Sequence, residues 1–447
     1  MTVTAHGSSD VLVRAADAGD TYLAWRWLDA LDDARAARLD ATIVDAAIDQ
    51  LDSALIAKLS DDELPAAAAQ RAMQGGALTS LAREQSLAST LAEAILPARL
   101  VEDISTHLAN GKRPRLRLTP SPRLARVPWE ILRIGDGDQR LLDVVDIVYD
   151  PPATVRAERS TPARRWPVHA GKPGLFIIDP ETPGHPQAQP VVSLDTGAGR
   201  RIRRQLEEHL ESGGAHEDEQ DLWFGGQNFT RNWLSEALIR TPRSRLFYYG
   251  HVSAEPDEPG SASLHLSDVS DTSWGMARPL GTHLPLSALD LLLGTTMAPE
   301  EYKGRYPDAE TDAGHHIWPM PSRVAVIACE GGADYRSRET FGLVIAMLNA
   351  GAELVTTTRW TLPTDLAFWH FHDDVARRGV HPTTELALTV DRAHTLDDPV
   401  SELLTWQRNQ LNSWRDSGGA IEFSPLVWAS LTNTWGPDAT VIEQPSG

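Results

Sequence analysis

The chain has 447 residues, 41% of them hydrophobic, and a formal net charge of -21 from 62 acidic and 41 basic side chains. Length and composition predict a globular protein of two or three domain-sized units. The acidic balance excludes nucleic acid as an expected partner, because most of the surface would repel a phosphate backbone. No stretch approaches the roughly 18 apolar residues of a membrane helix and no signal peptide is recognisable. We therefore expect a cytoplasmic protein that has no membrane partner.

The first 80 residues are acidic and are predicted to be helical. Between residues 20 and 60 apolar side chains recur four apart, which is the period of an amphipathic helix: Leu39, Ile43, Ala47, Leu51, Leu55 and Leu59. A second helical stretch ends at "NGKRP" with Gly and Pro. Strand-like "RLRL" (115–118) and "LLDVVDIVY" (141–149) follow, and a Pro/Arg-rich linker comes after them. We predict a helical segment at 1–80 and an α+β region at 81–165.

Residues 166–447 alternate between short apolar runs and helix-length pieces, which predicts an α/β domain with a mostly parallel sheet. The expected strands are 175–179, 221–224, 245–249, 323–328 and 353–358. The expected helices between them are 197–211, 229–240, 285–294 and 339–350. Helices at 363–378 and 383–418 and a strand "PLVWASLT" (425–432) are predicted to close the domain. Ligand sites are expected at the carboxyl ends of the strands.

Two of these strands stop on residues that can carry acyl-transfer chemistry. "RLFYYGH" ends at His251, and "RVAVIAC" ends at Cys329, the single cysteine of the chain. A thiolate attacks a carbonyl while an imidazole accepts and later returns a proton, so the pair suffices for nucleophilic catalysis. Gly331 and Gly332 would let a substrate backbone approach, and the N–H of Cys329 could face the oxyanion. Alternatively, Cys329 is a small core residue.

Other chemistries find less support in the sequence. The motifs of P-loops, dinucleotide folds, serine hydrolases and zinc peptidases are missing. The pairs His315/His316 and His370/His372 lack an acid or Cys at a ligand spacing that would complete a metal site. We therefore predict no metal and no cofactor.

The order of several segments resembles the CHAT domain, a caspase-like peptidase unit. The segments are "RLFYYGH", "ASLHLSD", "LPLSALDLLL", "VAVIACEGG" and "FGLVIAMLNAGAELVTTTRW". "RVPWEIL" and "SPLVWASLTNTW" resemble the upstream and closing parts of the family, so the resemblance covers roughly residues 80–435. The caspase signature is Q-A-C-x-G with a His about 50 residues earlier. Here Ile327 replaces the Gln, and 78 residues separate His251 from Cys329.

The resemblance implies a caspase-like three-layer sandwich for residues 166–447, with residues 81–165 as the upstream part of the CHAT unit. It implies that His251 is the general base and acid and that Cys329 is the nucleophile. The second oxyanion donor would be the N–H after the histidine, which here belongs to Val252. Val252 stands where the family usually has glycine.

The resemblance also implies a substrate-binding groove. Asp179 would shape the pocket for the residue before the cut and favour Lys or Arg there by charge pairing, unless it only starts the turn "DPETPG". The strand 353–358, with Arg359 and Trp360, would pair with an extended substrate by β-addition. Trp360 could instead be a core residue.

The function that the resemblance implies is a cysteine endopeptidase that cleaves specific proteins in a regulated bacterial conflict or stress system. The alternative is a catalytically inactive caspase-like interaction module. We expect the substrate to be a protein encoded nearby. Because the first 80 residues show no repeat period, we expect any trigger to be a regulatory partner protein instead of a repeat array.

Overall fold

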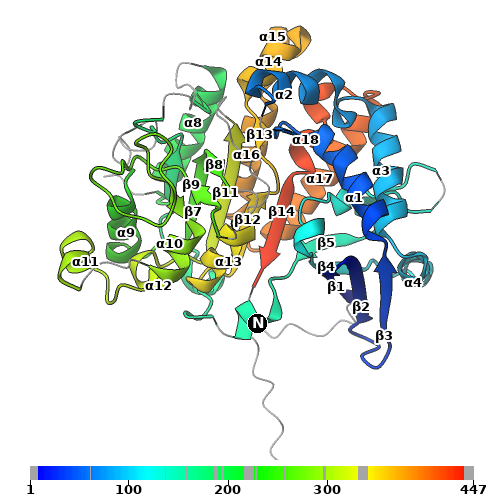
Figure 1. Ribbon diagram of the computed structural model, residues 1–447, viewed down its shortest axis with the longest axis horizontal. Coiled ribbons are helices and arrows are strands. Elements are labelled where there is room, and N and C mark those ends of the chain that lie inside the picture. The colour runs from blue at the N-terminus through cyan, green and yellow to red at the C-terminus, as the bar shows by residue number, and fades with distance from the viewer. Residues whose placement is uncertain are drawn as a thin grey trace, which may run out of the picture.

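Figure 1 shows an α/β arrangement in which helices surround a long sheet. The structure is a computed structural model, and it describes residues 9–60, 62–135, 137–157, 159–185, 190–192, 196–215, 226, 229–254, 258, 260–294, 299–330 and 341–436. Among the described residues, no helix combines the length and the apolar character needed to span a membrane.

The first part of the chain forms five strands with helices between them. Its elements are β1 (Asp10–Ala18), β2 (Asp20–Trp27), β3 (Ala34–Leu39), α1 (Ala41–Ser53), α2 (Pro65–Gln70), η1 (Arg71–Gly75), η2 (Ala77–Thr79), α3 (Leu81–Ile95), α4 (Ala98–Ala109), β4 (Arg115–Thr119), η3 (Pro122–Leu124), η4 (Trp129–Ile131), α5 (Leu141–Val144), β5 (Asp146–Tyr149), α6 (Ala153–Ala157) and α7 (Trp166–His169).

Strands and helices alternate through the middle of the chain. The elements are β6 (Leu175–Ile178), α8 (Gly197–Glu211), α9 (Arg231–Arg240), β7 (Arg245–Gly250), β8 (Val252–Ser253), β9 (Ser263–Leu264), β10 (Leu286–Ser287), α10 (Ala288–Leu293), α11 (Pro299–Arg305), α12 (Gly314–Ile317), β11 (Arg323–Glu330), α13 (Phe341–Asn349) and β12 (Leu354–Thr358).

Helices dominate the last part of the chain. The elements are β13 (Leu362–Pro363), α14 (Asp365–Phe371), α15 (Asp373–Arg378), α16 (Pro382–Ala393), α17 (Pro399–Asp416), η6 (Ile421–Phe423), α18 (Pro425–Trp428) and β14 (Leu431–Trp435).

The described strands form one large sheet and one small sheet. The large sheet has 11 strands in the order β3-β2-β1-β4-β5-β14-β12-β11-β7-β6, with β13 paired to β11. Its pairings are parallel except for β3–β2, β2–β1 and β14–β12. The small sheet has the order β10-β9-β8. A mostly parallel sheet of this kind confirms the predicted α/β class.

Side chains alternate between the two faces of the large sheet, and each face is buried by its own helices. On β7, Leu246 and Tyr248 face one core, while Phe247 and Tyr249 face the other. The first core includes residues of α9, α10 and α13, and the second includes residues of α8, α16 and α17. Because both faces are covered, all of β7 is buried. The result is the predicted three-layer arrangement.

The prediction that residues 1–80 are helical is wrong for residues 10–39, which form β1, β2 and β3. Burial alternates along β2, with Leu23, Trp25 and Trp27 inside, and this is the period of a strand with one solvated face. The four-residue spacing was a helix signal only over α1. Even there the exposed side chain of Ile43 lies outside the core.

Two further predicted strands are partly helical in the structure. Residues 141–144 form the short helix α5, so only 146–149 is a strand there, and residues 425–428 form α18 because Ser424 caps a turn that begins with Pro425. The predicted strand 221–224 lies outside the described residues. The large sheet crosses the predicted boundaries near 80 and 165 without interruption, and the division into three parts stays a prediction.

Candidate active site

The two predicted catalytic residues lie at the same edge of the sheet, His251 directly after β7 and Cys329 near the end of the neighbouring strand β11, where it pairs with Leu362 of β13. β7 and β11 are parallel and in register through the pair Gly250 and Ala328. His251 and Cys329 are the next residues on these strands. Paired strands lie about 4.8 Å apart, so the two backbones run side by side at this point. The side chain of Cys329 and residues 331–340 lie outside the described part of the chain, and a contact between thiol and imidazole stays a prediction.

The Tyr248 hydroxyl fixes the backbone at His251. It donates to the His251 carbonyl (2.6 Å) and accepts from the N–H of His265 (3.2 Å). A Cβ at Gly250 would lie 2.8 Å from this hydroxyl and 3.2 Å from Pro180 Cδ. Only glycine therefore fits between Tyr248 and His251 without displacing its neighbours.

Three further histidines from different segments lie near His251. The His265 ring lies 6.3 Å from the His251 ring and 5.0 Å from the His283 ring, with which it stacks. The His185 ring lies 6.2 Å from both His265 and His283. Burial lowers the pKa of His283 to about 4 and holds the pKa of His265 well below its usual range. His265 and His283 are therefore neutral near pH 7 and place no positive charge beside His251.

The predicted second oxyanion donor, Val252, begins β8. The N–H of His265 donates to the carbonyl of His251 (3.1 Å) across the β8–β9 ladder. Val252 and Leu264 are thus a non-hydrogen-bonded pair of an antiparallel ladder, in which backbone N–H groups point away from the partner strand. The Val252 N–H is therefore directed away from β9. Its role as an oxyanion donor stays a prediction.

Asp179 directly follows β6 at the same edge of the sheet, with its carboxylate buried. Val191 and Val192 donate their backbone N–H groups to the two carboxylate oxygens (2.9 and 3.1 Å). Asp179 also adopts φ 49°, a left-handed conformation that Asp tolerates better than most residues. These contacts support the alternative in which Asp179 organises the loop after β6. Recognition of a basic side chain by Asp179 stays a prediction.

Arg359 and Trp360, predicted to bind substrate, lie in the interior. The Arg359 Nη2 donates to both carboxylate oxygens of Glu130 (2.8 and 2.7 Å), and the Arg359 side chain also contacts the Val127 carbonyl. Trp360 is 2% exposed and donates its Nε1–H to the Leu426 carbonyl (2.9 Å). The two side chains have almost no surface to offer a peptide, so the core interpretation of Trp360 is the one that these contacts support.

The prediction that the strand at 353–358 adds a substrate strand is wrong. β12 pairs with β11 along one edge and with β14 along the other. Both rows of backbone donors and acceptors are occupied by the sheet, so a peptide could add there only by displacing a strand.

Sequence reasoning missed the roles of Tyr248 and His265. The sequence predicts Tyr248 to lie in an apolar strand, and nothing in the sequence marks its hydroxyl as functional. His265 lies in "ASLHLSD", a segment that resembles the family only by its place in the order of motifs. A polar atom inside a buried strand needs a partner, which is the one signal that could have pointed to Tyr248.

The histidine pairs weighed as metal ligands have other contacts. The His316 Nδ1 lies 2.7 Å from Thr311 Oγ1, and the His372 Nε2 lies 3.0 Å from the Met73 carbonyl. Within the part of the chain that the structure describes, no group of three metal-ligating side chains is arranged to hold a metal ion.

The fold places this protein in the α/β class, with reactive residue types at the carboxyl edge of a mostly parallel sheet. The sequence matches the CHAT domain family over residues 85–434, which is more than half of the chain, and the protein therefore belongs to this family. The resemblance noted from the motifs is confirmed. No curated protein matches the sequence.

Among solved structures, the chain is similar to one from the Saccharomyces cerevisiae separase–securin complex, determined at 3.0 Å resolution. The TM-score is 0.43 and the sequence identity is 8%. The similarity covers 96% of this chain and 30% of that chain, so the protein spans under a third of that chain's length.

Proposed function

We propose that this protein is a caspase-like cysteine endopeptidase that cleaves specific protein substrates with a His251/Cys329 dyad. Membership of the CHAT domain family supports the class of reaction. The observation that carries the proposal is the register of β7 and β11, in which His251 and Cys329 directly follow Gly250 and Ala328, the last residue pair between these two strands. Activity in a regulated bacterial conflict or stress system is part of the proposal and rests on the family resemblance.

The proposed chemistry proceeds in two steps. His251 accepts the thiol proton, and the Cys329 sulfur attacks the scissile carbonyl to form a tetrahedral oxyanion. The N–H groups of Cys329 and Val252 would stabilise this oxyanion. When the C–N bond breaks, His251 returns the proton to the leaving amine, and a thioester remains. Water, deprotonated by His251, then hydrolyses the thioester and regenerates the thiol.

The test is co-expression of the protein with the products of neighbouring genes. Three versions are compared: wild type, Cys329→Ala and His251→Ala. Mass spectrometry of new protein N-termini should find a cut with wild type that both variants lose. The variants should keep the melting temperature of the wild type, which separates loss of chemistry from loss of fold. A cut that persists in Cys329→Ala would contradict the proposal.

One observation favours the alternative, an inactive interaction module. His251 is 2% exposed and Val252 is 0% exposed, so neither side chain is open to solvent in this structure. If the protein is an inactive module, the wild type and Cys329→Ala should bind a protein encoded nearby equally well. Binding by both versions, measured by co-purification, together with no cut in either, would favour the module.

A further inference from the structure

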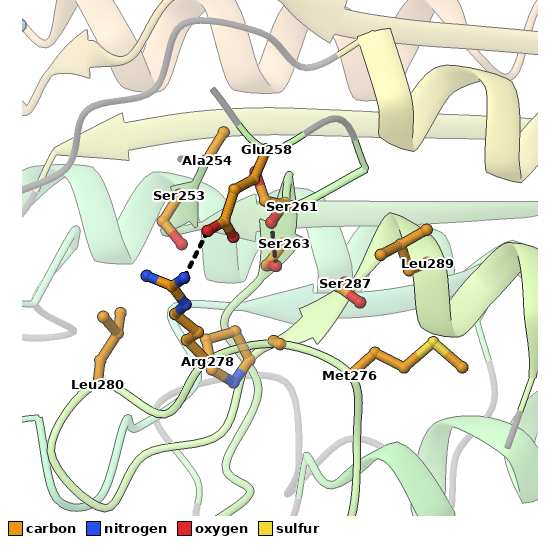
Figure 2. Close-up of a pocket in the computed structure, with 12 residues that line it drawn as sticks. Ser253, Ala254, Glu258, Ser261, Ser263, Met276, Arg278, Leu280, Ser287 and Leu289 are labelled. Carbon is orange, nitrogen blue, oxygen red and sulfur yellow. Dashed lines mark hydrogen bonds and ion pairs between the residues drawn. The ribbon is translucent and has the colours of Figure 1, made fainter. Parts of the chain in front are cut away.

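A small pocket lies on the strand that continues from His251 (Figure 2). Its lining comes from the small sheet, from the segment between β8 and β9, from the loop between β9 and β10, and from the start of α10. The lining residues are Ser253, Ala254, Glu258, Ser261, Ser263, Met276, Ala277, Arg278, Leu280, Pro285, Ser287 and Leu289. We call it the serine pocket.

The floor of the serine pocket is a row of three serines. The register of the small sheet aligns Ser253 with Ser263 and Ser263 with Ser287. Neighbouring positions in the same strands align Val252, Leu264 and Leu286, which are all buried in the core. Because successive residues of a strand face opposite sides, the apolar side anchors the small sheet and the hydroxyl side faces the pocket.

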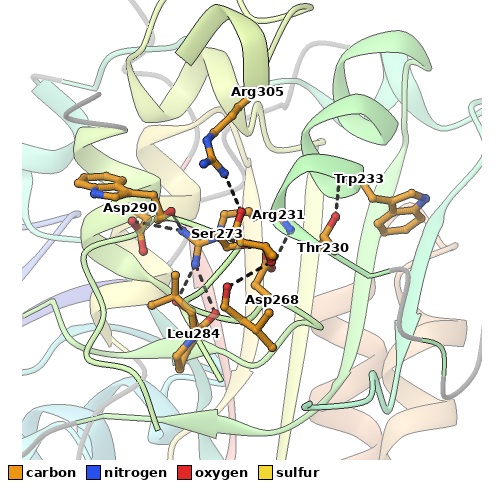
Figure 3. A network of polar contacts seen from close by, with 12 residues as sticks. Thr230, Arg231, Trp233, Asp268, Ser273, Leu284, Asp290 and Arg305 are labelled. Carbon is orange, nitrogen blue, oxygen red and sulfur yellow. Dashed lines mark hydrogen bonds and ion pairs between the residues drawn. The ribbon is translucent and has the colours of Figure 1, made fainter. Parts of the chain in front are cut away.

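The wall of the pocket is held by a buried arginine (Figure 3). The wall is the loop 274–285, which lies between β9 and β10. Arg231 is 1% exposed, and its guanidinium donates to the carbonyls of Trp274 (2.6 Å) and Pro285 (2.9 Å), at the two ends of this loop. The Asp290 carboxylate accepts from the N–H of Met276 (2.9 Å) and from Ser287 in the floor. The wall and the floor are thus tied to the same buried groups, which gives a preformed pocket.

The size and charge of the pocket limit what it can hold. Its volume is about 70 Å³, which is room for a small side chain only. The charged lining residues in the described part of the chain are Glu258 and Arg278, which pair with each other at 2.6 Å and are 45% and 75% exposed. A charged occupant would lose hydration with no unpaired counter-charge inside.

The serine pocket connects to the candidate site through two contacts. The Ser253 Oγ lies 2.8 Å from His265 Nε2, and the His265 ring lies 6.3 Å from the His251 ring. Under the proposed function, His251 gives its proton to the leaving amine. A pocket built on the strand that leaves His251 is therefore placed for the part of the substrate that departs with that amine.

We propose that the serine pocket binds the side chain of the substrate residue that directly follows the cleaved bond, and that it selects a small uncharged side chain such as Ala, Ser, Thr or Val. This inference rests on the proposed function and specifies its substrate class. It is separate from the prediction that Asp179 reads the residue before the cut.

The test is digestion of a proteome-derived peptide library, with cut sites identified by mass spectrometry. Cuts that Cys329→Ala lacks should be followed by small uncharged residues.

Ser263→Leu fills the pocket from the floor and Ala277→Phe fills it from the wall, so a variant that fails to fold can be replaced by the other. Each should lower kcat/KM for a peptide with Thr after the cut by about 10-fold or more. The same peptide with Gly there should lose much less. Ser270→Leu, in the same loop but outside the lining, is the matched control.

The outcomes separate the pocket from the chemistry. Cys329-dependent cuts with no preference for the following residue, or with a preference that both filling variants leave unchanged, would overturn the pocket and leave the peptidase intact. No Cys329-dependent cut in any sample would overturn the proposed function and the role of the pocket with it.

Discussion

Tyr248 holds the candidate base through its hydroxyl as well as through its ring. The ring packs in the core with α9, α10 and α13, while the hydroxyl bonds to the backbone of both His251 and His265. A phenylalanine would keep the packing and remove this donor, while the His251 carbonyl would still accept from the N–H of His265, so we expect a cost of about 0.5–1.5 kcal/mol. Tyr248 is therefore a positioning residue in our interpretation.

Tyr248→Phe should change the reactivity of the single thiol. A correctly placed His251 would lower the pKa of Cys329, so its rate of alkylation by iodoacetamide should persist at mildly acidic pH. The variant should move this pH profile upward by about 0.5–1 unit, part of the way to His251→Ala. Tyr249→Phe is the matched control, because Tyr249 packs in the core on the opposite face of the sheet. If Tyr248→Phe and wild type gave one profile, the positioning role would be wrong.

Asp179 makes the stability of the protein depend on pH. Burial raises the pKa of its carboxyl from 3.8 to about 6, although the N–H groups of Val191 and Val192 oppose this shift. The folded state therefore holds the proton more tightly than the unfolded state. The stabilisation is complete below about pH 4 and is lost as the pH rises through about 6, for a total of about 3 kcal/mol.

Asp179→Asn should remove this dependence. Asn is neutral at every pH and tolerates φ near 49°, so the backbone conformation can persist. The free energy of unfolding of the variant, relative to wild type, should increase by about 3 kcal/mol between pH 4 and pH 7.5. Urea titrations of both proteins across this range provide the measurement. Parallel curves for the two proteins would contradict the assigned burial of the carboxylate.

At the scale of elements, the strands that carry the candidate site could be predicted from the sequence. β6, β7, β11 and β12 are buried on both faces and therefore read as short continuous apolar runs. β1 to β3 could not be recognised, because four-residue spacing beyond them suggested a helix. The environment of Arg359 was also hidden, since its partner Glu130 lies 229 residues away in sequence. A motif indicates which residues lie at the end of a strand, but it does not indicate which side chain, distant in sequence, contacts them.

We interpret the segment that joins β12 to β13 as part of the core and not of a substrate groove. A substitution of Trp360 tests this interpretation. Trp360→Ala would leave a cavity in the core and remove the hydrogen bond to Leu426. We expect a loss of about 3–5 kcal/mol in the free energy of unfolding. Trp435→Ala, at a Trp that is 39% exposed, should cost much less. Denaturant unfolding of both variants decides the matter. Weakened cleavage with unchanged stability in Trp360→Ala would restore the predicted role in the groove.

At the scale of the whole molecule, the first strands are part of the same sheet as the candidate site. β1 pairs with β4 over five residues, and β4 leads through β5 and β14 to β12 and β11. One core cluster contains Trp360, residues of β7 and β11, and apolar residues of β1 and β2. The β1 and β2 residues in it are Val11, Val13, Leu23, Trp25 and Trp27. The family match starts only at residue 85, but the packing continues across that point.

This continuity predicts that residues 1–40 cannot be removed without damage to the rest. Their removal would expose the β4 edge and a face of the core, and exposed apolar edges pair with other chains. The chain from residue 41 onward should therefore aggregate or melt at a much lower temperature than the full chain. Removal of residues 1–8 alone, which precede the first described residue, is the control. Solubility and melting temperature are measured for both truncations. A chain that lacks residues 1–40 yet melts at the full-length temperature would show that the N-terminal strands are an accessory, and that the large sheet is stable from β4 onward.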